Sequence, residues 1–143
     1  MEKYESSQKQ ILRGQERSYE KLCDLRNVEK YVPKDASILE QAKLEDIEFG
    51  QDYISFKASM VGKVTLRIID RESPKMVKFG VEGVPVAANL WVQLVGVAEA
   101  DTRMKLTVKA DIPLMLRPMV GNKLKDGVEK LADLLKFMLE ADD

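Results

Sequence analysis

A change of hydrophobic period near residue 113 constrains the fold more than any other feature of this sequence. Before that point, apolar and polar residues alternate through six segments, as they do in strands with one buried face. After it, a single apolar stripe recurs at steps of three and four: Val120, Leu124, Val128, Leu131, Leu135 and Met138. The sequence therefore predicts a sheet followed by one helix over 119–139, which would be about 30 Å long.

Turn residues divide the alternating region into segments of strand length. The expected strands cover residues 38–48, 53–61, 64–70, 76–81, 86–98 and 103–112. Short stretches such as "EFGQD", "RESPK" and "EGVP" separate them. Because connections this short join antiparallel neighbours, these strands are expected to form an antiparallel meander.

The residues before the meander predict one strand and two short helices. Residues 3–12 lack glycine and proline and can form an opening strand. The apolar residues of 15–24 recur at helical spacing, and those of 25–32 repeat the pattern. Asp24 is suited to cap a helix or a turn, and Pro33 disfavours helix at the residue before it. Two short helices are therefore expected to meet near Asp24.

The composition fits a single domain over residues 1–143. The chain is 45% hydrophobic and 33% charged, and its formal net charge is −1. Nucleic-acid binders usually carry an excess of Lys and Arg, so we expect no nucleic-acid partner. No apolar run reaches the roughly 18 residues of a membrane span, and "MEKYESSQKQ" lacks the apolar stretch of a signal peptide. We therefore expect a cytoplasmic location, and the single Cys23 fits a reducing compartment.

The sequence contains no histidine, which removes imidazole as a general base, an acid or a metal ligand. With only one cysteine as well, the usual ligands of structural zinc are missing. We therefore expect no metal and no cofactor. Carboxylates, hydroxyls, Lys, Arg and Tyr are the groups left for chemistry.

The order strand, two short helices, six strands and long helix resembles the SRPBCC superfamily of helix-grip proteins, which includes START lipid-transfer domains, the birch pollen allergen and small bacterial polyketide cyclases. The resemblance is carried by "YEKLCDLRNVEKYVP" in the helix pair, "TRMKLTV" in the last strand and "LKDGVEKLADLL" in the closing helix. A further stretch, "FKASMVGKVTLRIID", is similar to the branch of the superfamily that is named after carbon monoxide dehydrogenase, in which a glycine turn joins two middle strands. Such patterns specify a fold better than an activity.

The resemblance implies an α+β helix-grip fold, in which a curved antiparallel sheet of seven strands wraps around the C-terminal helix. Two short helices after the first strand would close one end of a cavity between sheet and helix; an ordinary packed core is the alternative. Strand alternation places mainly aliphatic and aromatic side chains on the inner face. The residues that we expect to bind a ligand there are Gln8, Gln10, Tyr31, Ile54, Phe56, Phe79, Leu90, Val92, Leu106, Met119, Leu124 and Gly127.

The segment 86–98 is apolar on both faces, so its register decides which face lies inside. A two-residue turn at 100–101 would place Trp91 inside, whereas a three-residue connection at 99–101 would place Leu90 and Val92 inside. The resemblance favours the second arrangement, with Trp91 and Val95 on the outer face. An exposed apolar strip often marks a partner surface, so we expect a homodimer through the face that carries Trp91.

Gln8 and Gln10 share one face of the opening strand with Ser6. Burying this uncharged set costs less than burying the charged residues of the other face, so their amides could hold a carbonyl or hydroxyl of a ligand. A strand solvated on both faces is the alternative.

Gly127 lies inside the expected closing helix, where glycine costs roughly 1 kcal/mol relative to alanine. It falls on the side of Leu124 and Leu131, which should face the sheet. Its missing side chain would leave room either for a ligand or for close packing on a large residue such as Phe79.

The leading interpretation is a binding protein for a small hydrophobic molecule such as a lipid, an isoprenoid or a polyketide-like ring. The lack of histidine and of a paired-carboxylate motif favours binding. The resemblance implies two alternatives. One is a cyclase or aromatase enzyme with dehydratase-type chemistry, for which Tyr31, Tyr53 and Arg117 are the candidate groups. The other is an accessory protein that assists assembly of a cofactor enzyme.

Overall fold

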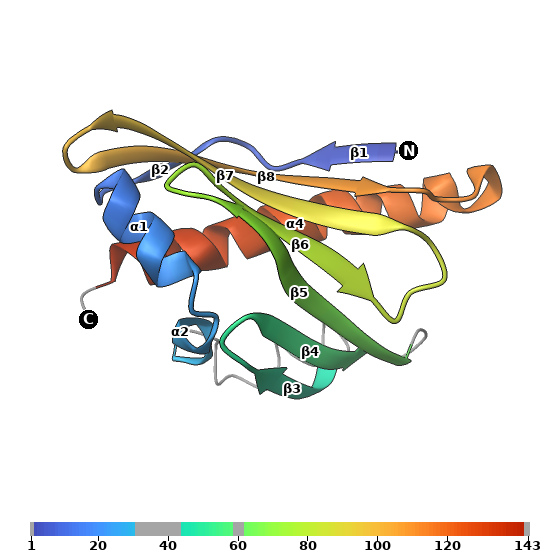
Figure 1. The fold of residues 1–143 in the computed structure, drawn as a ribbon. Helices are drawn as coiled ribbons and strands as arrows, with labels where there is room; N and C mark the ends of the chain where they lie inside the picture. The colour runs from blue at the N-terminus through green and yellow to red at the C-terminus, as the bar shows by residue number, and fades with distance from the viewer. Residues whose placement is uncertain (1, 31–43, 59–61, 142–143) are drawn as a thin grey trace.

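The structure is a computed structural model that describes residues 2–30, 44–58 and 62–141 (Figure 1). The strands are β1 (Glu2–Glu5), β2 (Lys9–Ile11), β3 (Leu44–Phe49), β4 (Tyr53–Ala58), β5 (Gly62–Glu72), β6 (Met76–Glu82), β7 (Ala88–Ala98) and β8 (Asp101–Ala110). The helices are α1 (Gln15–Leu22), α2 (Arg26–Glu29), the 3-10 turn η1 (Leu114–Leu116) and α4 (Arg117–Glu140). This order agrees with the one predicted from the period of the sequence.

All of these strands belong to one antiparallel sheet in the order β1-β8-β7-β6-β5-β4-β3, and β2 also pairs with β8. Consecutive strands from β3 to β8 are neighbours, so the predicted meander is confirmed. The sheet curves around α4, with α1 and α2 at one end (Figure 1). The α+β helix-grip architecture is therefore the one that the resemblance implied. Of the expected strands, the parts at 38–43 and 59–61 lie outside the described residues.

The expected opening strand is broken in two, which is why eight strands are described rather than seven. Glu5 pairs with Thr107 and Lys9 pairs with Met104, so four steps along one strand oppose three along the other. Such an extra residue bends a strand and reverses the faces beyond it. The backbone N–H of Leu106 donates to Ser6 Oγ at 2.9 Å, so this N–H keeps a hydrogen-bond partner where the pairing of the strands is interrupted. As a result Ile11, not Gln10, is buried.

The hairpin between β7 and β8 differs from both turns considered from the sequence. Ala98 pairs with Asp101, so the turn residues are 99 and 100, and the register shifts by one residue between Gly96 and Ala98. Because of this bulge, the β7 residues that face α4 are the ones that the three-residue connection would have placed inside. The face prediction is therefore confirmed, although the predicted turn is wrong. The buried residues of β7 are Leu90, Val92 and Leu94.

Helix α4 covers the inner face of the sheet along β8, β1 and β2. The buried residues of α4 are Val128, Ala132, Leu135, Met138 and Leu139. Val128, Leu135 and Met138 belong to the stripe predicted from the sequence, whereas Val120, Leu124 and Leu131 of that stripe are only partly buried. Before Val128, α4 contributes no buried side chain among those that the structure describes.

Candidate ligand site between the sheet and helix α4

Four of the predicted lining residues lie together at the centre of the sheet. Phe79 pairs with Leu90 and Val92 pairs with Leu106, and each is at most 4% exposed. All four belong to one apolar cluster with the buried residues of α4. They are brought together as predicted, and they form packed core in this structure.

The helices α1 and α2 complete this packed region at the C-terminal end of α4. Their buried apolar residues are Tyr19, Leu22, Leu25 and Val28. Lys21 Nζ donates to the carbonyl oxygen of Ala141 at 3.0 Å, which ties α1 to the end of α4. We call this part of the core, together with Leu94, Met104 and Met138, the closed half. The two short helices therefore lie at one end of the space between the sheet and α4, and that end is packed core.

A second set of apolar side chains contacts the core and yet stays partly exposed to solvent. We call these residues the open half: Phe49, Ile54, Leu66, Leu131 and Leu134. Ile54 and Leu66 are partners across β4 and β5, and Leu131 and Leu134 lie on α4. Apolar surface is therefore incompletely covered on the sheet and on the helix alike.

Gly127 lies one turn before Leu131 on the same side of α4. A Cβ atom built on Gly127 meets no atom of the described residues within 4 Å. At Gly121, by contrast, a Cβ would lie 3.1 Å from Tyr4 Oη. Within the described part of the chain, the close packing on Phe79 that we considered for Gly127 is not observed.

The remaining apolar candidates are placed as follows. Leu124 is half-buried one turn before Val128, and Phe56 is half-buried opposite Val64. Met119 lies in the first turn of α4, and Tyr31 lies outside the described residues. The structure thus places Leu124 and Gly127 on the same half of α4.

Gln8 and Gln10 do not lie between the sheet and α4. Both side chains are exposed, and Gln10 Nε2 donates to Asp101 Oδ2 at 3.2 Å. The physical reason is the extra residue near Ser6, which turns the uncharged face of the opening strand outward after the break. Polar residues occupy both faces of this segment, so the sequence contains no signal that could have located the break.

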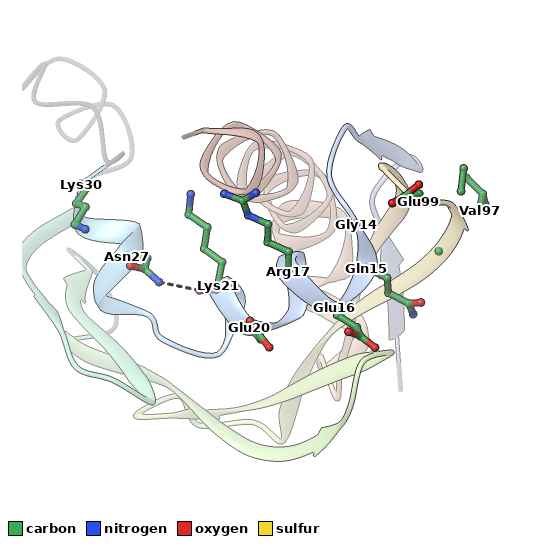
Figure 2. Close-up of a pocket in the computed structure, with 12 residues that line it drawn as sticks. Gly14, Gln15, Glu16, Arg17, Glu20, Lys21, Asn27, Lys30, Val97 and Glu99 are labelled. Carbon is green, nitrogen blue, oxygen red and sulfur yellow. Dashed lines mark hydrogen bonds between the residues drawn. The ribbon is translucent and has the colours of Figure 1, made fainter. Parts of the chain in front are cut away.

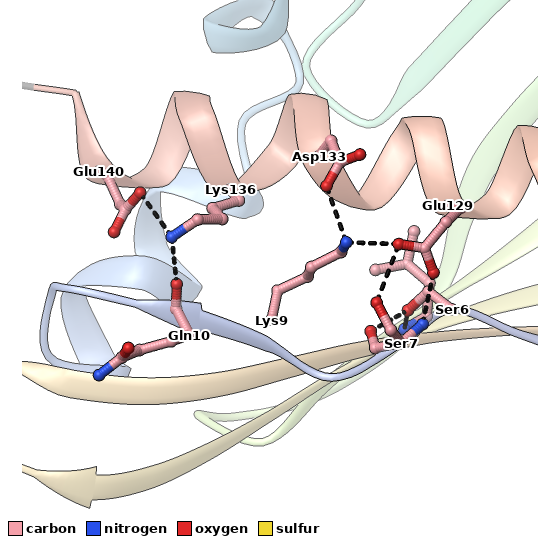
Figure 3. A network of polar contacts seen from close by, with 9 residues as sticks. Ser6, Ser7, Lys9, Gln10, Glu129, Asp133, Lys136 and Glu140 are labelled. Carbon is pink, nitrogen blue, oxygen red and sulfur yellow. Dashed lines mark hydrogen bonds and ion pairs between the residues drawn. The ribbon is translucent and has the colours of Figure 1, made fainter.

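The break instead directs Lys9 toward α4, where it forms ion pairs with Glu129 and Asp133 (Figure 3). Glu129 Oε1 also accepts the backbone N–H of Ser7 at 2.6 Å. Hydrogen bonds from Lys9, and then from Ser7, lower the pKa of Glu129 to about 2. The pKa of Lys9 is raised, mainly by Asp133 and then by Glu129. This network, with Lys136 donating to the carbonyl of Gln10 at 2.5 Å, fastens α4 to the broken strand.

The two described candidates for catalysis have partners away from the open half. Tyr53 Oη donates to Glu48 Oε1 at 2.8 Å, and this hydrogen bond raises the pKa of Tyr53. Arg117 Nε donates to the carbonyl of Ile112 at 3.1 Å, and Arg117 also pairs with Glu2. Neither side chain belongs to the apolar cluster.

A hollow of about 1130 Å³ lies over α1, α2 and the tip of the β7–β8 hairpin (Figure 2). Charged side chains of both signs line it: Glu16, Arg17, Glu20, Lys21, Lys30 and Glu99. It contains none of the predicted lining residues, and its polar wall does not match an apolar ligand. The sequence does not predict this hollow, because the pattern of these residues is typical of the solvated faces of two short helices.

A second hollow, of about 700 Å³, lies on the outer face of the sheet and includes Trp91 and Gln8. The nitrogen atoms of Lys78 and Lys109 lie 5.1 and 5.5 Å from the Trp91 ring centroid. Trp91 thus stands on the outer face, as the favoured register predicted. Val95, on the same face, is 58% exposed.

Neither a membrane-spanning helix nor a metal cluster is found in the described part of the chain. No helix among the described residues is both long enough and apolar enough to cross a membrane. In the same residues, no group of three or more His, Cys, Asp and Glu side chains is arranged to hold a metal ion.

Several solved structures share the fold at low sequence identity. Norcoclaurine synthase from Thalictrum flavum, in complex with dopamine and hydroxybenzaldehyde, superposes with a TM-score of 0.74 and 10% identity, covering 99% of this chain and 88% of that one. A START superfamily protein from Mycobacterium smegmatis superposes with a TM-score of 0.68 at 10% identity, and the match covers 96% of this chain and 97% of that one. A conserved protein from Geobacillus kaustophilus superposes with a TM-score of 0.63 at 16% identity, and the match covers 96% of this chain and 93% of that one. No family model matches the sequence, and no curated protein matches it significantly.

Together, the sheet topology and these likenesses show that the chain has a START-like, helix-grip fold. Norcoclaurine synthase, which shares this fold, holds dopamine and hydroxybenzaldehyde in its structure.

Proposed function

We propose that this protein binds a small hydrophobic molecule, such as a lipid, an isoprenoid or a polyketide-like ring, between α4 and the β4–β5 side of the sheet. The observation that carries the proposal is the open half, in which apolar side chains on helix and sheet stay partly exposed, together with the open space at Gly127. Covering such surface is favourable by roughly 25 cal/mol per Å² of apolar area removed from water.

The chemistry of the walls indicates the kind of molecule. Every member of the open half is aliphatic or aromatic, and none carries a charge. A charged group buried there would lose its hydration without gaining a partner from these residues. The part of the ligand that enters this site is therefore uncharged and apolar.

Gly127 adds space where a side chain would otherwise stand. Glycine destabilises a helix interior, so a position that nothing packs against would ordinarily favour alanine or leucine. A ligand lying along this side of α4 would give the glycine a role. The fold supports this proposal, since its relatives include a START superfamily protein and an enzyme holding two small aromatic molecules.

Binding fits the described residues better than catalysis does. Tyr53 and Arg117, the described candidates for a cyclase, make their contacts with Glu48, Ile112 and Glu2 rather than with the open half. A cytoplasmic location and a homodimer through the Trp91 face complete the proposal.

The experiment is a fluorescence titration with the apolar probe N-phenyl-1-naphthylamine, using Gly127→Leu and a matched control. Asn122 is an exposed residue five positions earlier, about 140° around the helix from Gly127, so Asn122→Leu adds the same side chain elsewhere on α4. We expect Gly127→Leu to weaken binding at least tenfold while keeping or raising the thermal midpoint, because leucine is the better helix former. Asn122→Leu should bind as the wild type does. Equal binding by both variants, or overpacking that lowers the stability of Gly127→Leu, would contradict the proposed position of the site.

A further inference from the structure

The 3-10 turn η1 presents three consecutive large apolar side chains to solvent. Leu114 is 73% exposed, Met115 is 90% exposed and Leu116 is 46% exposed. Among the described residues, Met115 is the most exposed large hydrophobic side chain. Scattered single exposures are ordinary on a protein surface, whereas three in sequence at one end of the fold indicate a contact surface.

The turn is held rigidly by its own backbone. Pro113 precedes it and Pro118 lies in the first turn of α4, and the backbone N–H of Leu116 donates to the carbonyl of Pro113 at 2.9 Å. Ile112 is buried directly before the turn, and its carbonyl accepts a hydrogen bond from Arg117. The three apolar side chains therefore project from a fixed base, so ordering this turn on a partner would cost little conformational entropy.

Basic residues accompany the turn. From residue 109 to residue 125 the chain carries Lys109, Arg117, Lys123 and Lys125 against one acidic residue, Asp111. All three lysines are exposed. Arg117 is paired with Glu2, so the exposed lysines supply the positive charge on either side of the turn in the chain. An apolar projection flanked in this way is complementary to an anionic lipid surface, in which acyl chains lie beneath negatively charged head groups.

A second copy of the chain is a poorer occupant. The surface area of three side chains is far smaller than the roughly 800 Å² that each partner buries in a stable protein interface. The hollow over α1 and α2 is lined largely by charged and polar residues, so it offers no apolar socket for this projection. A lipid surface needs no matching socket, because acyl chains rearrange around whatever enters them.

We propose that Leu114, Met115 and Leu116 form a membrane-docking tip that inserts into the interface of an anionic bilayer while the rest of the chain stays outside it. The tip lies at the N-terminal end of α4, which is the half of the helix that carries Leu124 and Gly127 (Figure 1). This inference stands independently of the ligand proposal, since its evidence is the exposed turn and not the open half.

The test is co-sedimentation with vesicles of phosphatidylcholine alone and of phosphatidylcholine mixed with phosphatidylglycerol. We expect the wild type to bind the mixed vesicles and to bind pure phosphatidylcholine at least tenfold more weakly. The double variant Leu114→Ser/Met115→Ser should lose at least tenfold in affinity for the mixed vesicles. A matched double variant at the β7–β8 hairpin end of the sheet, Leu12→Ser/Val97→Ser, also removes two exposed apolar side chains and should bind like the wild type.

Three results would overturn the proposal. The wild type could fail to bind either vesicle, it could bind both equally, or the Leu114→Ser/Met115→Ser variant could bind as well as the wild type. Light scattering without lipid supplies an independent check. If the wild type were an oligomer and only the Leu114→Ser/Met115→Ser variant a monomer, the tip would be a self-association surface instead.

Discussion

The division of the core into a closed and an open half predicts different costs for the same substitution at two neighbouring positions of α4. Leu135 is 4% exposed, whereas Leu131, one turn earlier, is partly exposed in the open half. Both lie inside the same helix, so the change in helix propensity on Leu→Ala cancels between them. The comparison isolates how completely each side chain is enclosed.

The loss of unfolding free energy in each variant follows from how completely the leucine side chain is enclosed. Leu135→Ala leaves a cavity in packed core, which costs about 3 kcal/mol of unfolding free energy, within the usual range for buried leucine. Leu131→Ala removes a side chain beside open space, so the cavity term largely vanishes and about 1–1.5 kcal/mol of transfer energy remains. The expected difference between the two variants is therefore about 1.5–2 kcal/mol.

Urea unfolding followed by circular dichroism measures both values, with the slope m checked for equality so that midpoints can be compared. The protein should be freed of any bound apolar molecule first, since a ligand would stabilise the native state by mass action. If Leu131→Ala cost as much as Leu135→Ala in the ligand-free protein, Leu131 would be part of closed core, and the reasoning that defines the open half would be refuted.

Two further predictions concern the charge network and the outer face. Glu129 has a folded pKa of about 2 against an ordinary 4.5, so its stabilising contribution is complete above about pH 4.5 and is lost as the pH falls toward 2. The urea midpoint of the wild type should therefore decline in that window, and Glu129→Gln should flatten the decline. An unchanged decline in Glu129→Gln would exclude a role for this carboxylate. Trp91→Lys should give a folded monomer in light scattering where the wild type is a dimer, and unfolding of this variant would instead assign Trp91 a role in stability.

The inner faces of the long strands could be predicted from the sequence because one face is apolar and the other polar. In β8, Met104 and Leu106 alternate with Arg103 and Lys105, and the structure buries the apolar pair. In β7 both faces are apolar, so alternation gave no answer. The correct face followed from the family resemblance, while the turn was missed because a bulge at Val97 changes the count of residues in the hairpin.

The site was less predictable than the fold, for physical reasons that differ between residues. Gln8 and Gln10 were misplaced because an extra residue at a strand break depends on pairing with β8, which no local pattern in "ESSQKQ" encodes. Phe79 and Leu106 were correctly placed inside, yet periodicity cannot distinguish a side chain that lines a space from one that fills it. That distinction required the exposed fractions of Leu66 and Leu131 and the emptiness around Gly127.

The measurement that tests the proposed ligand binding most directly is native mass spectrometry of the protein purified from its own host, followed by solvent extraction and identification of what is released. We expect a protein ion heavier than the mass of the chain by one small apolar molecule, with that excess missing from Gly127→Leu and present in Asn122→Leu. A wild-type ion at the mass of the chain alone, from preparations in which a known lipid-carrying protein keeps its ligand, would contradict the proposal that this protein holds a hydrophobic molecule between its sheet and α4.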